Sequence, residues 1–516
     1  MSELGSPNPG SEAHGRSRVP LVAALATFAI HVVGNPHYGF FRDELYFIVC
    51  GQHPQWGYVD QPPIAPLLAA ASQLFGHSLL LLRAVPAAFG AAGVYVTCLL
   101  VLELGGTAFA QVVAALAVFF APVLMNFAMK VSPDMVGLWL WPLAALYALR
   151  LTRGADPRGW LAVGAIAGIS LQAKYSVLFF LVALLLALLL TPERRILFSR
   201  WFVVGAAVCA LVALPNFLWQ AYYGFPMLEL LQVGQHGKNL IVGPLTYLFQ
   251  ELLITNVFLS VIWIVGLGWL LWNARVRFLG LTFVILIALM ILAHGKHYYP
   301  ADAFPLVIAA GAVVVERWTS RRTLARAAVL AAEVVFGLVF LPLAMPVLPE
   351  PGLAAYEHYL SGMLHVQRQA VATDRERPGV LPSDFADMHG WPELAATVGR
   401  VYRSLSANER AQAVVFAGNY GEAGAIDFFG KPYGLPPVIS GHNQYFLWGP
   451  RGHSGNVVID VGGDCGAREG LFVTAERAAT FTARWIQPYE NDLPIMVCRG
   501  IKRPLQELWP SAKGYR

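Results

Sequence analysis

Charged side chains are scarce in this sequence, and their scarcity excludes an ordinary soluble protein. Asp, Glu, Lys and Arg make up 13% of the 516 residues, whereas apolar residues make up 57%; soluble proteins carry about 25% charged residues. The net charge of +5 gives no reason to expect a nucleic-acid partner, because basic loops that flank membrane spans account for it. The composition predicts an integral membrane protein.

The sequence also lacks the motifs of a zinc site and of a nucleotide-binding site. The five cysteines show no spacing typical of a zinc site, and no GxGxxG or P-loop motif marks a nucleotide site. Cys50 lies in a polar loop, Cys98 and Cys209 lie in apolar segments, and Cys465 and Cys498 lie in the polar C-terminal part. An oxidising compartment would favour a bond between these last two, and the sequence leaves that bond open.

The uneven distribution of charge divides the chain into three parts. Residues 1–18 are rich in Ser, Gly and Pro, which predicts a disordered cytosolic tail. Residues 19–347 contain long stretches nearly free of charge and are predicted to form a transmembrane module, whereas residues 348–516 resemble a soluble domain. The first apolar stretch begins near Pro20 without an obvious small-residue cleavage site, so we interpret it as a retained span.

About eleven segments are apolar enough to cross a bilayer, which takes about 20 residues. They cover residues 19–35, 79–103, 108–128, 133–152, 159–173, 175–191, 199–218, 245–271, 278–294, 299–316 and 325–346. A single helix over 159–191 would be about 50 Å long, too long for a hydrocarbon core of about 30 Å. It would also place Lys174 near the bilayer centre, so we expect two short helices that meet near Lys174.

The distribution of arginine sets the predicted orientation. With the N-terminus inside, the cytosolic loops carry Arg150, Arg153 and Arg158; Arg194, Arg195 and Arg200; Arg275 and Arg277; and Arg317, Arg321, Arg322 and Arg326. The opposite loops carry mostly single basic residues, as the positive-inside rule requires. We therefore expect a multi-pass protein of the inner (plasma) membrane whose C-terminal domain is extracytoplasmic.

The first outer loop carries an acidic pair at the membrane edge. Asp43 and Glu44 follow Arg42 directly after the first span, and an aromatic and proline-rich segment with Tyr58 and Asp60 comes next. Segments of this kind suit the membrane interface, and we take Arg42, Tyr58 and Asp60 as candidates for an acceptor-binding loop. The alternative is that Asp43 and Glu44 form an ordinary solvated pair.

Other outer corners add a further carboxylate and several cationic groups. Asp134 opens the fourth span, Lys174 lies between two short helices, and Lys296, His297 and Tyr298 join the ninth and tenth spans. Asp134 could merely complement a helix dipole, and the basic residues could be interface anchors. Together, however, carboxylates suit proton transfer or metal binding, and lysine suits phosphate. The set favours transfer from a phosphate-linked donor to a hydroxyl group.

Six motifs follow one another along the chain: RDELYF, GYVDQPPIAPL, SPD, QAKYS, LPNFLWQ and GKHYYPADAFP. Taken in order, they resemble the bacterial branch of the dolichyl-phosphate-mannose protein mannosyltransferase superfamily. Its members are GT-C glycosyltransferases (family 39-like), including protein O-mannosyltransferases and aminoarabinose transferases. The stretch 416–450 also resembles the extracytoplasmic domain of many bacterial members. The resemblance implies a polytopic α-helical fold of GT-C type with a C-terminal α/β domain.

The resemblance also implies catalytic roles. Asp43 would be the general base, Glu44 would position the acceptor or a metal, and Asp134 would assist acceptor or metal binding. Because family members differ in metal use, a divalent cation at Asp43 and Asp134 stays open.

The same resemblance implies the donor and the reaction. Lys174 and Lys296, with His297 and Tyr298, would hold the phosphate of a polyprenyl-phosphate sugar. The enzyme would be a hexosyl- or pentosyltransferase that acts at the lipid bilayer, and the hydroxyl of a protein, glycolipid or polysaccharide would attack with inversion. The sugar and the acceptor stay open.

The C-terminal part predicts alternating strands and helices. A helix is expected over 394–405 and strands over 413–418, 455–462 and 493–500, which favours a three-layer α/β domain. The turn at 419–422 (NYGE) follows the first strand. It could be merely structural, bind part of an acceptor, or cover the active site.

Two other classes of function remain as alternatives. A secondary transporter would have a similar number of spans, but transporters place polar features near the midplane in repeated halves, and no such repeat is present. A non-catalytic envelope assembly protein would leave the gathering of carboxylates and cations at the outer face unexplained.

Overall fold

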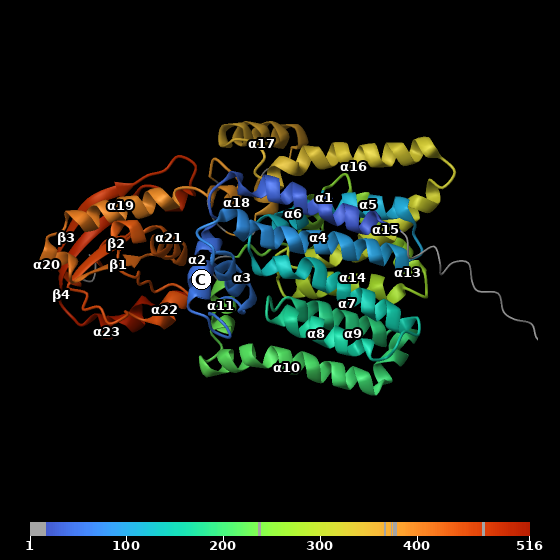
Figure 1. Ribbon diagram of the computed structural model, residues 1–516, viewed down its shortest axis with the longest axis horizontal. Helices are drawn as coiled ribbons and strands as arrows, with labels where there is room; N and C mark the ends of the chain where they lie inside the picture. Colours follow the sequence, from blue (N-terminus) through green and yellow to red (C-terminus); the bar gives the residue numbers. More distant parts are fainter. Residues whose placement is uncertain are drawn as a thin grey trace, which may run out of the picture.

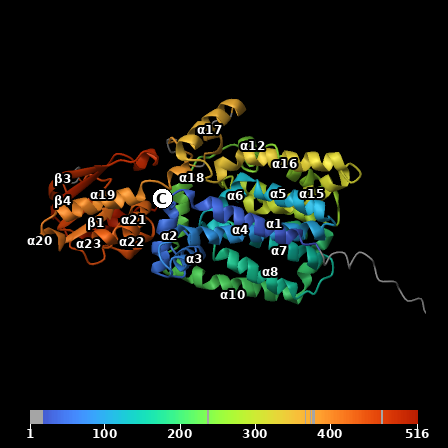
Figure 2. The same ribbon diagram turned by 45° about the horizontal axis from the view of Figure 1, so that its top comes forward.

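The computed structural model describes residues 17–235, 239–365, 368–372, 374, 379–466 and 470–515. Two parts lie end to end along the longest axis, a bundle of roughly aligned helices and a smaller part built on a β-sheet (Figure 1). The turned view shows the same arrangement (Figure 2). The predicted tail falls almost entirely outside the described residues.

The helices of the bundle follow the predicted apolar segments. They are α1 (Val19–Gly34), α4 (Leu79–Glu103), α5 (Ala108–Phe119), α6 (Pro122–Met129), α7 (Gly137–Thr152), α8 (Gly159–Leu171), α9 (Val177–Leu189), α10 (Arg200–Tyr222), α12 (Pro244–Ile254), α13 (Ser260–Trp272), α14 (Arg277–Leu292), α15 (Phe304–Trp318) and α16 (Thr323–Ala344). The predicted pair of short helices is confirmed, because α8 ends just before Lys174 and α9 begins just after it.

Two of the predicted spans are broken. The segment 108–128 bends by 69° between α5 and α6, where Pro122 cannot donate to the helical hydrogen-bond ladder. The prediction of one helix over 245–271 is wrong, because α12 ends at Ile254 and Asn256 has a left-handed φ of 71°. Asparagine tolerates this conformation better than most residues. A hydropathy window does not register such a break.

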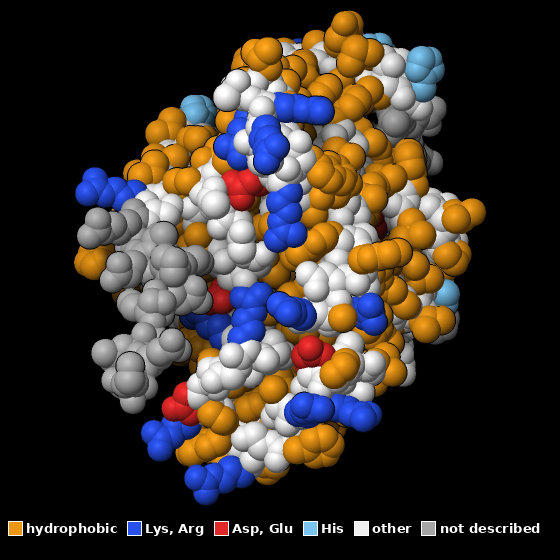
Figure 3. Space-filling model, turned by 90° about the vertical axis from the view of Figure 1, so that its right-hand side faces the viewer, with side chains coloured by type: hydrophobic (Ala, Val, Ile, Leu, Met, Phe, Trp, Pro, Cys, Tyr) orange, Lys and Arg blue, Asp and Glu red, His pale blue; other side chains and the backbone are white. Residues whose placement is uncertain are grey.

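The number of membrane crossings stays a prediction. By length and composition, five helices of the described residues could cross a bilayer, or seven if each of two bent helix pairs is one span; three further apolar helices are shorter. Lys and Arg side chains gather at the end of the bundle that faces away from the sheet (Figure 3). That distribution agrees with an arginine-rich cytosolic end.

Further helices lie in the segments that link the bundle helices to one another and to the C-terminal part. They are α2 (Arg42–Gln52), α3 (Ile64–Ser72), α11 (Pro226–Val233), α17 (Glu350–Leu364) and α18 (Ser383–Ala386). The first two lie between the bundle and the sheet (Figure 1). The first outer loop is therefore helical over much of its length.

The C-terminal part is an α/β unit, as predicted. Its sheet has the order β1-β2-β4-β3, with β1 (Ala413–Ala417) parallel to β2 (Val457–Val461) and β4 (Leu493–Ile501) antiparallel to both β2 and β3 (Phe472–Phe481). The strand β3 was not predicted. The remaining helices are α19 (Trp391–Ser404), α20 (Ala407–Arg410), α21 (Tyr420–Phe429), α22 (Gln444–Trp448) and α23 (Leu505–Leu508).

Helical segments cover both faces of this sheet. Along β1, Val415 faces the cluster formed with α19 and α21, whereas Val414 faces Leu505 and Trp509, because successive side chains of a strand point to opposite faces. The three-layer arrangement is thus confirmed. Cys465 and Cys498 form a disulfide bond with a Cα–Cα distance of 5.8 Å, which settles the question left open by the sequence.

Candidate active site

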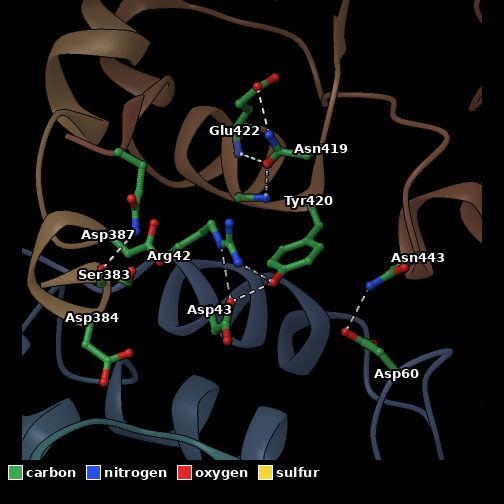
Figure 4. A network of polar contacts seen from close by, with 12 residues as sticks. Arg42, Asp43, Asp60, Ser383, Asp384, Asp387, Asn419, Tyr420, Glu422 and Asn443 are labelled. Atoms are coloured by element: carbon green, nitrogen blue, oxygen red, sulfur yellow. Dashed lines mark hydrogen bonds and ion pairs between the residues drawn. The ribbon is translucent and has the colours of Figure 1, made fainter. Parts of the chain in front are cut away.

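Asp43 lies in the first turn of α2, at the junction with the C-terminal part. Tyr420, the first residue of α21, donates a hydrogen bond from its hydroxyl to Asp43 Oδ1 over 2.8 Å. The Nε atom of Arg42 lies 3.6 Å from the same oxygen, and Figure 4 shows the three side chains converging. The Asp43 side chain is 32% exposed, so this carboxylate is held from one side and accessible from another.

Glu44, the second member of the acidic pair, is buried and engaged. Its carboxylate forms an ion pair of 3.1 Å with Arg83, and both side chains are fully buried. It also accepts hydrogen bonds from the backbone N–H groups of Phe41 (2.9 Å) and Val131 (3.1 Å). A fully buried carboxylate does not touch an acceptor directly, and the role of Glu44 in positioning the acceptor or a metal stays a prediction. In this structure Glu44 joins the start of α2 to α4, through Arg83, and to Val131 in the segment before α7.

The predicted residues Asp134 and Lys174 contact each other directly. Asp134 lies in a short 3₁₀ helix (Pro133–Val136) and forms an ion pair with Lys174. The Lys174 ammonium also lies 5.1 Å from the ring centroid of Tyr298 and 4.5 Å from that of Tyr299, a cation–π arrangement. Residues from three distant parts of the sequence thus meet at one corner.

Two more lysine–carboxylate pairs lie near this corner. Lys296 is 2.9 Å from Asp374, and Lys130 is 2.8 Å from Asp384. Burial raises the pKa of the Tyr298 hydroxyl, and the nearby Asp134, Asp374 and Asp384 raise it further. The carboxylates of all three pairs therefore act on one phenol. Sequence reasoning did not assign a role to Lys130, Asp374 or Asp384.

His297 lies within the same motif but carries no charge near neutral pH. Burial, together with the neighbouring Lys296, lowers its pKa to about 4. Without a bound phosphate, His297 therefore adds no positive charge to the site.

The remaining residues predicted for the first loop have different environments. Arg42 donates to the hydroxyls of Tyr420 (3.1 Å) and Tyr489, which ties α2 to the C-terminal part. Asp60 accepts hydrogen bonds from Tyr46 (2.9 Å) and Asn443 (3.2 Å). Burial raises the pKa of Asp60 to about 6, with a further contribution from Asp43.

Tyr58, by contrast, is fully buried, and its hydroxyl donates to the carbonyl of Cys50 over 2.8 Å. Tyr58 thus holds the loop itself together, and its part in an acceptor-binding loop stays a prediction.

Further acidic groups lie beside Arg42 and Asn419 and were not predicted. Asp387 is buried, and its Oδ1 has no hydrogen-bond partner among the described residues. Burial raises its pKa to about 7 despite the nearby Arg42, and Asp43, Glu490 and Asp384 add to the rise. Glu422 and Glu490 both accept from Asn419 Nδ2, over 2.8 and 2.9 Å. The NYGE turn was the only sequence signal for this cluster.

The described residues do not fit a metal site at Asp43 and Asp134. Within the described part of the chain, the one group of three potential ligands with atoms within 4.8 Å is Asp460 with Cys465 and Cys498, and those thiols form the disulfide. Asp134 is paired with Lys174, and Asp43 is held by Tyr420 and Arg42. We therefore derive no step through a metal.

An apolar groove of about 650 Å³ lies beside the site. Trp56 and Gln55 of the first loop line it, together with Leu211, Leu214, Pro215, Leu218, Trp219, Tyr222 and Tyr223. We call Lys174 and Lys296 with their carboxylate partners the lysine corner. Asn216 connects this corner to the groove. It accepts from the hydroxyl of Tyr175, the residue after Lys174, and donates to the carbonyl of Trp56 over 2.8 Å.

Comparison with known proteins gives a partial match in sequence. Residues 60–219 match the family model of dolichyl-phosphate-mannose-protein mannosyltransferase. A lipid A galacturonosyltransferase, RgtD, from Rhizobium johnstonii is 27% identical over 206 residues, which are 40% of this chain and 43% of that protein. The match thus spans less than half the length of this curated relative.

The fold is shared over nearly the whole chain. The crystal structure of ArnT from Cupriavidus metallidurans bound to undecaprenyl phosphate has a TM-score of 0.62 at 14% identity and covers 93% of this chain and 98% of its own. The apo structure of the same protein has a TM-score of 0.58 at 15% identity, with 94% and 98% covered. Together, the matches in sequence and fold confirm the resemblance to the GT-C superfamily.

Proposed function

We propose that this protein is a membrane glycosyltransferase that moves a sugar from a polyprenyl-phosphate donor to a hydroxyl group with inversion. One observation carries the proposal: the partly exposed carboxylate of Asp43 lies at the same end of the bundle as the lysine pairs of Lys174 and Lys296. The named activity of RgtD and the undecaprenyl phosphate bound to ArnT support this substrate class. They also make a lipid A-like glycolipid the first acceptor to test.

In this proposal Asp43 acts as the general base. Its carboxylate takes the proton of the acceptor hydroxyl while the acceptor oxygen bonds to the anomeric carbon of the sugar. The bond between that carbon and the phosphate oxygen breaks, and its electron pair leaves with the polyprenyl phosphate. Attack and departure on opposite faces of the sugar invert the configuration.

Lys174 and Lys296 offset the negative charge that develops on the departing phosphate. Each now has a carboxylate partner, Asp134 or Asp374, and a phosphate oxygen would take that partner's place. Tyr298, with its ring beside Lys174, would donate a hydrogen bond to the phosphate from a hydroxyl that stays protonated. Donor binding is therefore a competition between carboxylates and phosphate.

The apolar groove along α10 would hold the polyprenyl chain. Asn216 links the groove residue Trp56 to Tyr175, the residue that follows Lys174. Most of the side chains that line the groove are large and exposed, Leu214 and Trp56 among them at 42% and 61%. Prenyl units would cover this apolar surface, and burial of apolar surface is favourable.

We also propose residues 19–347 as the transmembrane catalytic module and 348–516 as an extracytoplasmic domain. The disulfide between Cys465 and Cys498 supports the outer location, because such bonds persist in oxidising compartments. Mass mapping of non-reduced protein from intact membranes tests it. Free thiols at both positions would contradict the outer location.

The central experiment offers purified protein a panel of polyprenyl-phosphate hexoses and pentoses, with lipid A-like and protein acceptors. We expect one donor to be consumed with formation of a glycosylated product and free polyprenyl phosphate. Asp43→Asn should abolish transfer while undecaprenyl phosphate still binds. Asp156→Asn serves as the control, because Asp156 is exposed and lies in the loop between α7 and α8.

No transfer from any donor by the wild-type protein would refute the proposed activity. Unchanged transfer by Asp43→Asn would remove Asp43 from the role of base.

A further inference from the structure

The C-terminal part supplies a side chain to the site that the helix bundle could not complete alone. Asp43 and Tyr420 are 377 positions apart in the chain, yet the Tyr420 hydroxyl donates to Asp43 Oδ1 over 2.8 Å. We infer that Tyr420 is a positioning residue that orients the carboxylate of Asp43 for proton transfer. This inference rests on the proposed function and deepens it, because it makes the C-terminal domain part of the active site.

The position of Tyr420 is fixed by the turn that precedes α21. Asn419 caps the helix, and its Oδ1 accepts hydrogen bonds from the N–H groups of Gly421 (2.8 Å) and Glu422 (3.0 Å). The N–H of Tyr420 itself donates to His442 Nδ1 over 3.2 Å. A capped first turn thus holds the backbone of Tyr420 in place.

The ring of Tyr420 is held as firmly as its backbone. Its centroid lies 4.7 Å from that of Tyr46 on α2 and 4.9 Å from that of His442, and the residue is 9% exposed. Because the ring has little freedom, its hydroxyl presents one direction to Asp43. A site residue is precise only when its supporting groups are themselves locked by packing.

Two glycines allow α21 to approach α2 closely enough for this contact. A Cβ atom at Gly421 would lie 2.3 Å from Arg42 Cγ, and one at Gly424 would lie 2.9 Å from the backbone nitrogen of Tyr46. Any larger residue would separate the two helices. The glycines of the NYGEAG stretch therefore serve the contact between the domain and the site.

The geometry leaves one oxygen of Asp43 for chemistry. Oδ1 faces Tyr420 and Arg42 (Figure 4), whereas Oδ2 accepts no hydrogen bond from the described residues. A carboxylate held by one oxygen can present the other to an acceptor hydroxyl in a fixed direction. Loss of the Tyr420 hydroxyl should therefore slow proton transfer without altering the lysine corner that would bind the donor.

The test compares Tyr420→Phe with Tyr445→Phe. Tyr445 is a matched control, because it is buried in the same domain, its ring also contacts Tyr46, and its hydroxyl donates to Asp427 rather than to Asp43. We expect Tyr420→Phe to lower kcat by about ten- to a hundredfold, as expected for a lost hydrogen bond to a charged group. The KM for the donor should stay unchanged.

The pH–rate profile separates positioning from packing. Without its donor the charged carboxylate is less favoured, so the acidic limb of the profile should move to higher pH in Tyr420→Phe and stay in place in Tyr445→Phe. Gly424→Ala provides a second route, because it should move α21 away from α2 and produce the same two changes. Thermal unfolding of each variant verifies that it is folded.

The outcomes distinguish this inference from the proposed function. Wild-type kcat and an unshifted profile in Tyr420→Phe would overturn the inference alone. An equal loss of kcat in both tyrosine variants, with unshifted profiles, would also overturn it, because the role would then be packing. Absence of transfer by the wild-type protein with every donor would overturn the proposed function and this inference together.

Discussion

The ammonium group of Lys130 lies 2.8 Å from the carboxylate of Asp384 and joins the end of α6 to the chain between α17 and α19. The same stretch of chain supplies Asp374 to Lys296 and places Asp387 beside Arg42. Lys130 and Lys296 of the bundle are thus neutralised by carboxylates that lie much later in the sequence. A phosphate that binds at this end must compete with them, and that competition gives a prediction for donor binding.

Removal of a competing carboxylate should strengthen donor binding. We expect Asp374→Asn to tighten binding of undecaprenyl phosphate by about 1.4- to fivefold, because a partly exposed ion pair contributes about 0.2–1 kcal/mol. Lys296→Met should weaken binding. Titration of each variant with undecaprenyl phosphate at low and high salt measures both effects.

Glu507→Gln is the control for this titration, because it breaks the exposed pair with Arg503 in the C-terminal part and should leave binding unchanged. Weaker binding by Asp374→Asn would show that Asp374 holds the lysine in place rather than competing for it.

Loss of the negative charge should destabilise the folded protein at Glu44 but not at Asp43. Glu44→Gln leaves Arg83 charged and unpaired in a fully buried position, which typically costs about 3–5 kcal/mol. We expect a large drop in the thermal unfolding midpoint and low yield, whereas Asp43→Asn should fold normally. The double variant Glu44→Gln, Arg83→Met should recover part of the stability, since no buried charge then lacks a partner. Equal stability of the two single variants would contradict this division.

The helix positions could be predicted from sequence because a membrane span is a local property. Twenty apolar residues mark a span wherever it packs, so α4 and α10 were found with nearly correct bounds. The break at Asn256 was missed, because it depends on one backbone conformation that hydropathy does not record.

The site was only partly predictable, because its contacts are not local. Asp43 and Lys174 were named as candidates from motif order and sidedness, and their roles stay predictions. The burial of Glu44 depends on Arg83, 39 positions away, and the contact between Asp43 and Tyr420 depends on the docking of a second domain. No periodicity or spacing encodes those distances. The glycine-containing turn of residues 419–422 was the one sequence signal here, because it could bind part of an acceptor or cover the active site.

The groove on α10 predicts a dependence on the length of the donor chain. Leu214→Trp places a larger side chain in the lining of this groove. We expect the KM for an undecaprenyl-linked donor to rise about tenfold, which corresponds to about two methylene groups no longer buried. The KM for a donor with only two isoprene units should change little. Kinetics with both donors measure the difference.

Val203→Trp is the matched control for the groove, because Val203 lies on the same helix, is 67% exposed and does not line the groove. It should leave both KM values unchanged. An equal rise in KM for the long and short donors would locate the polyprenyl chain elsewhere.

Asp387 predicts how stability depends on pH. Burial raises its pKa from 3.8 to about 7, against the opposing effect of Arg42. The folded protein therefore holds a proton that the unfolded chain has already released over this interval. By linkage, the contribution of Asp387 to stability falls as pH rises from about 4 to about 7 and is constant above that range.

The variant Asp387→Asn has a side chain of nearly the same shape that cannot ionise, so its unfolding midpoint should depend less on pH and exceed that of the wild type near pH 8. Thermal unfolding between about pH 5 and pH 8 tests this, with Asp156→Asn as an exposed control. An identical dependence on pH in Asp387→Asn and the wild type would show that another group, such as Asp60 with its pKa of about 6, carries the titration.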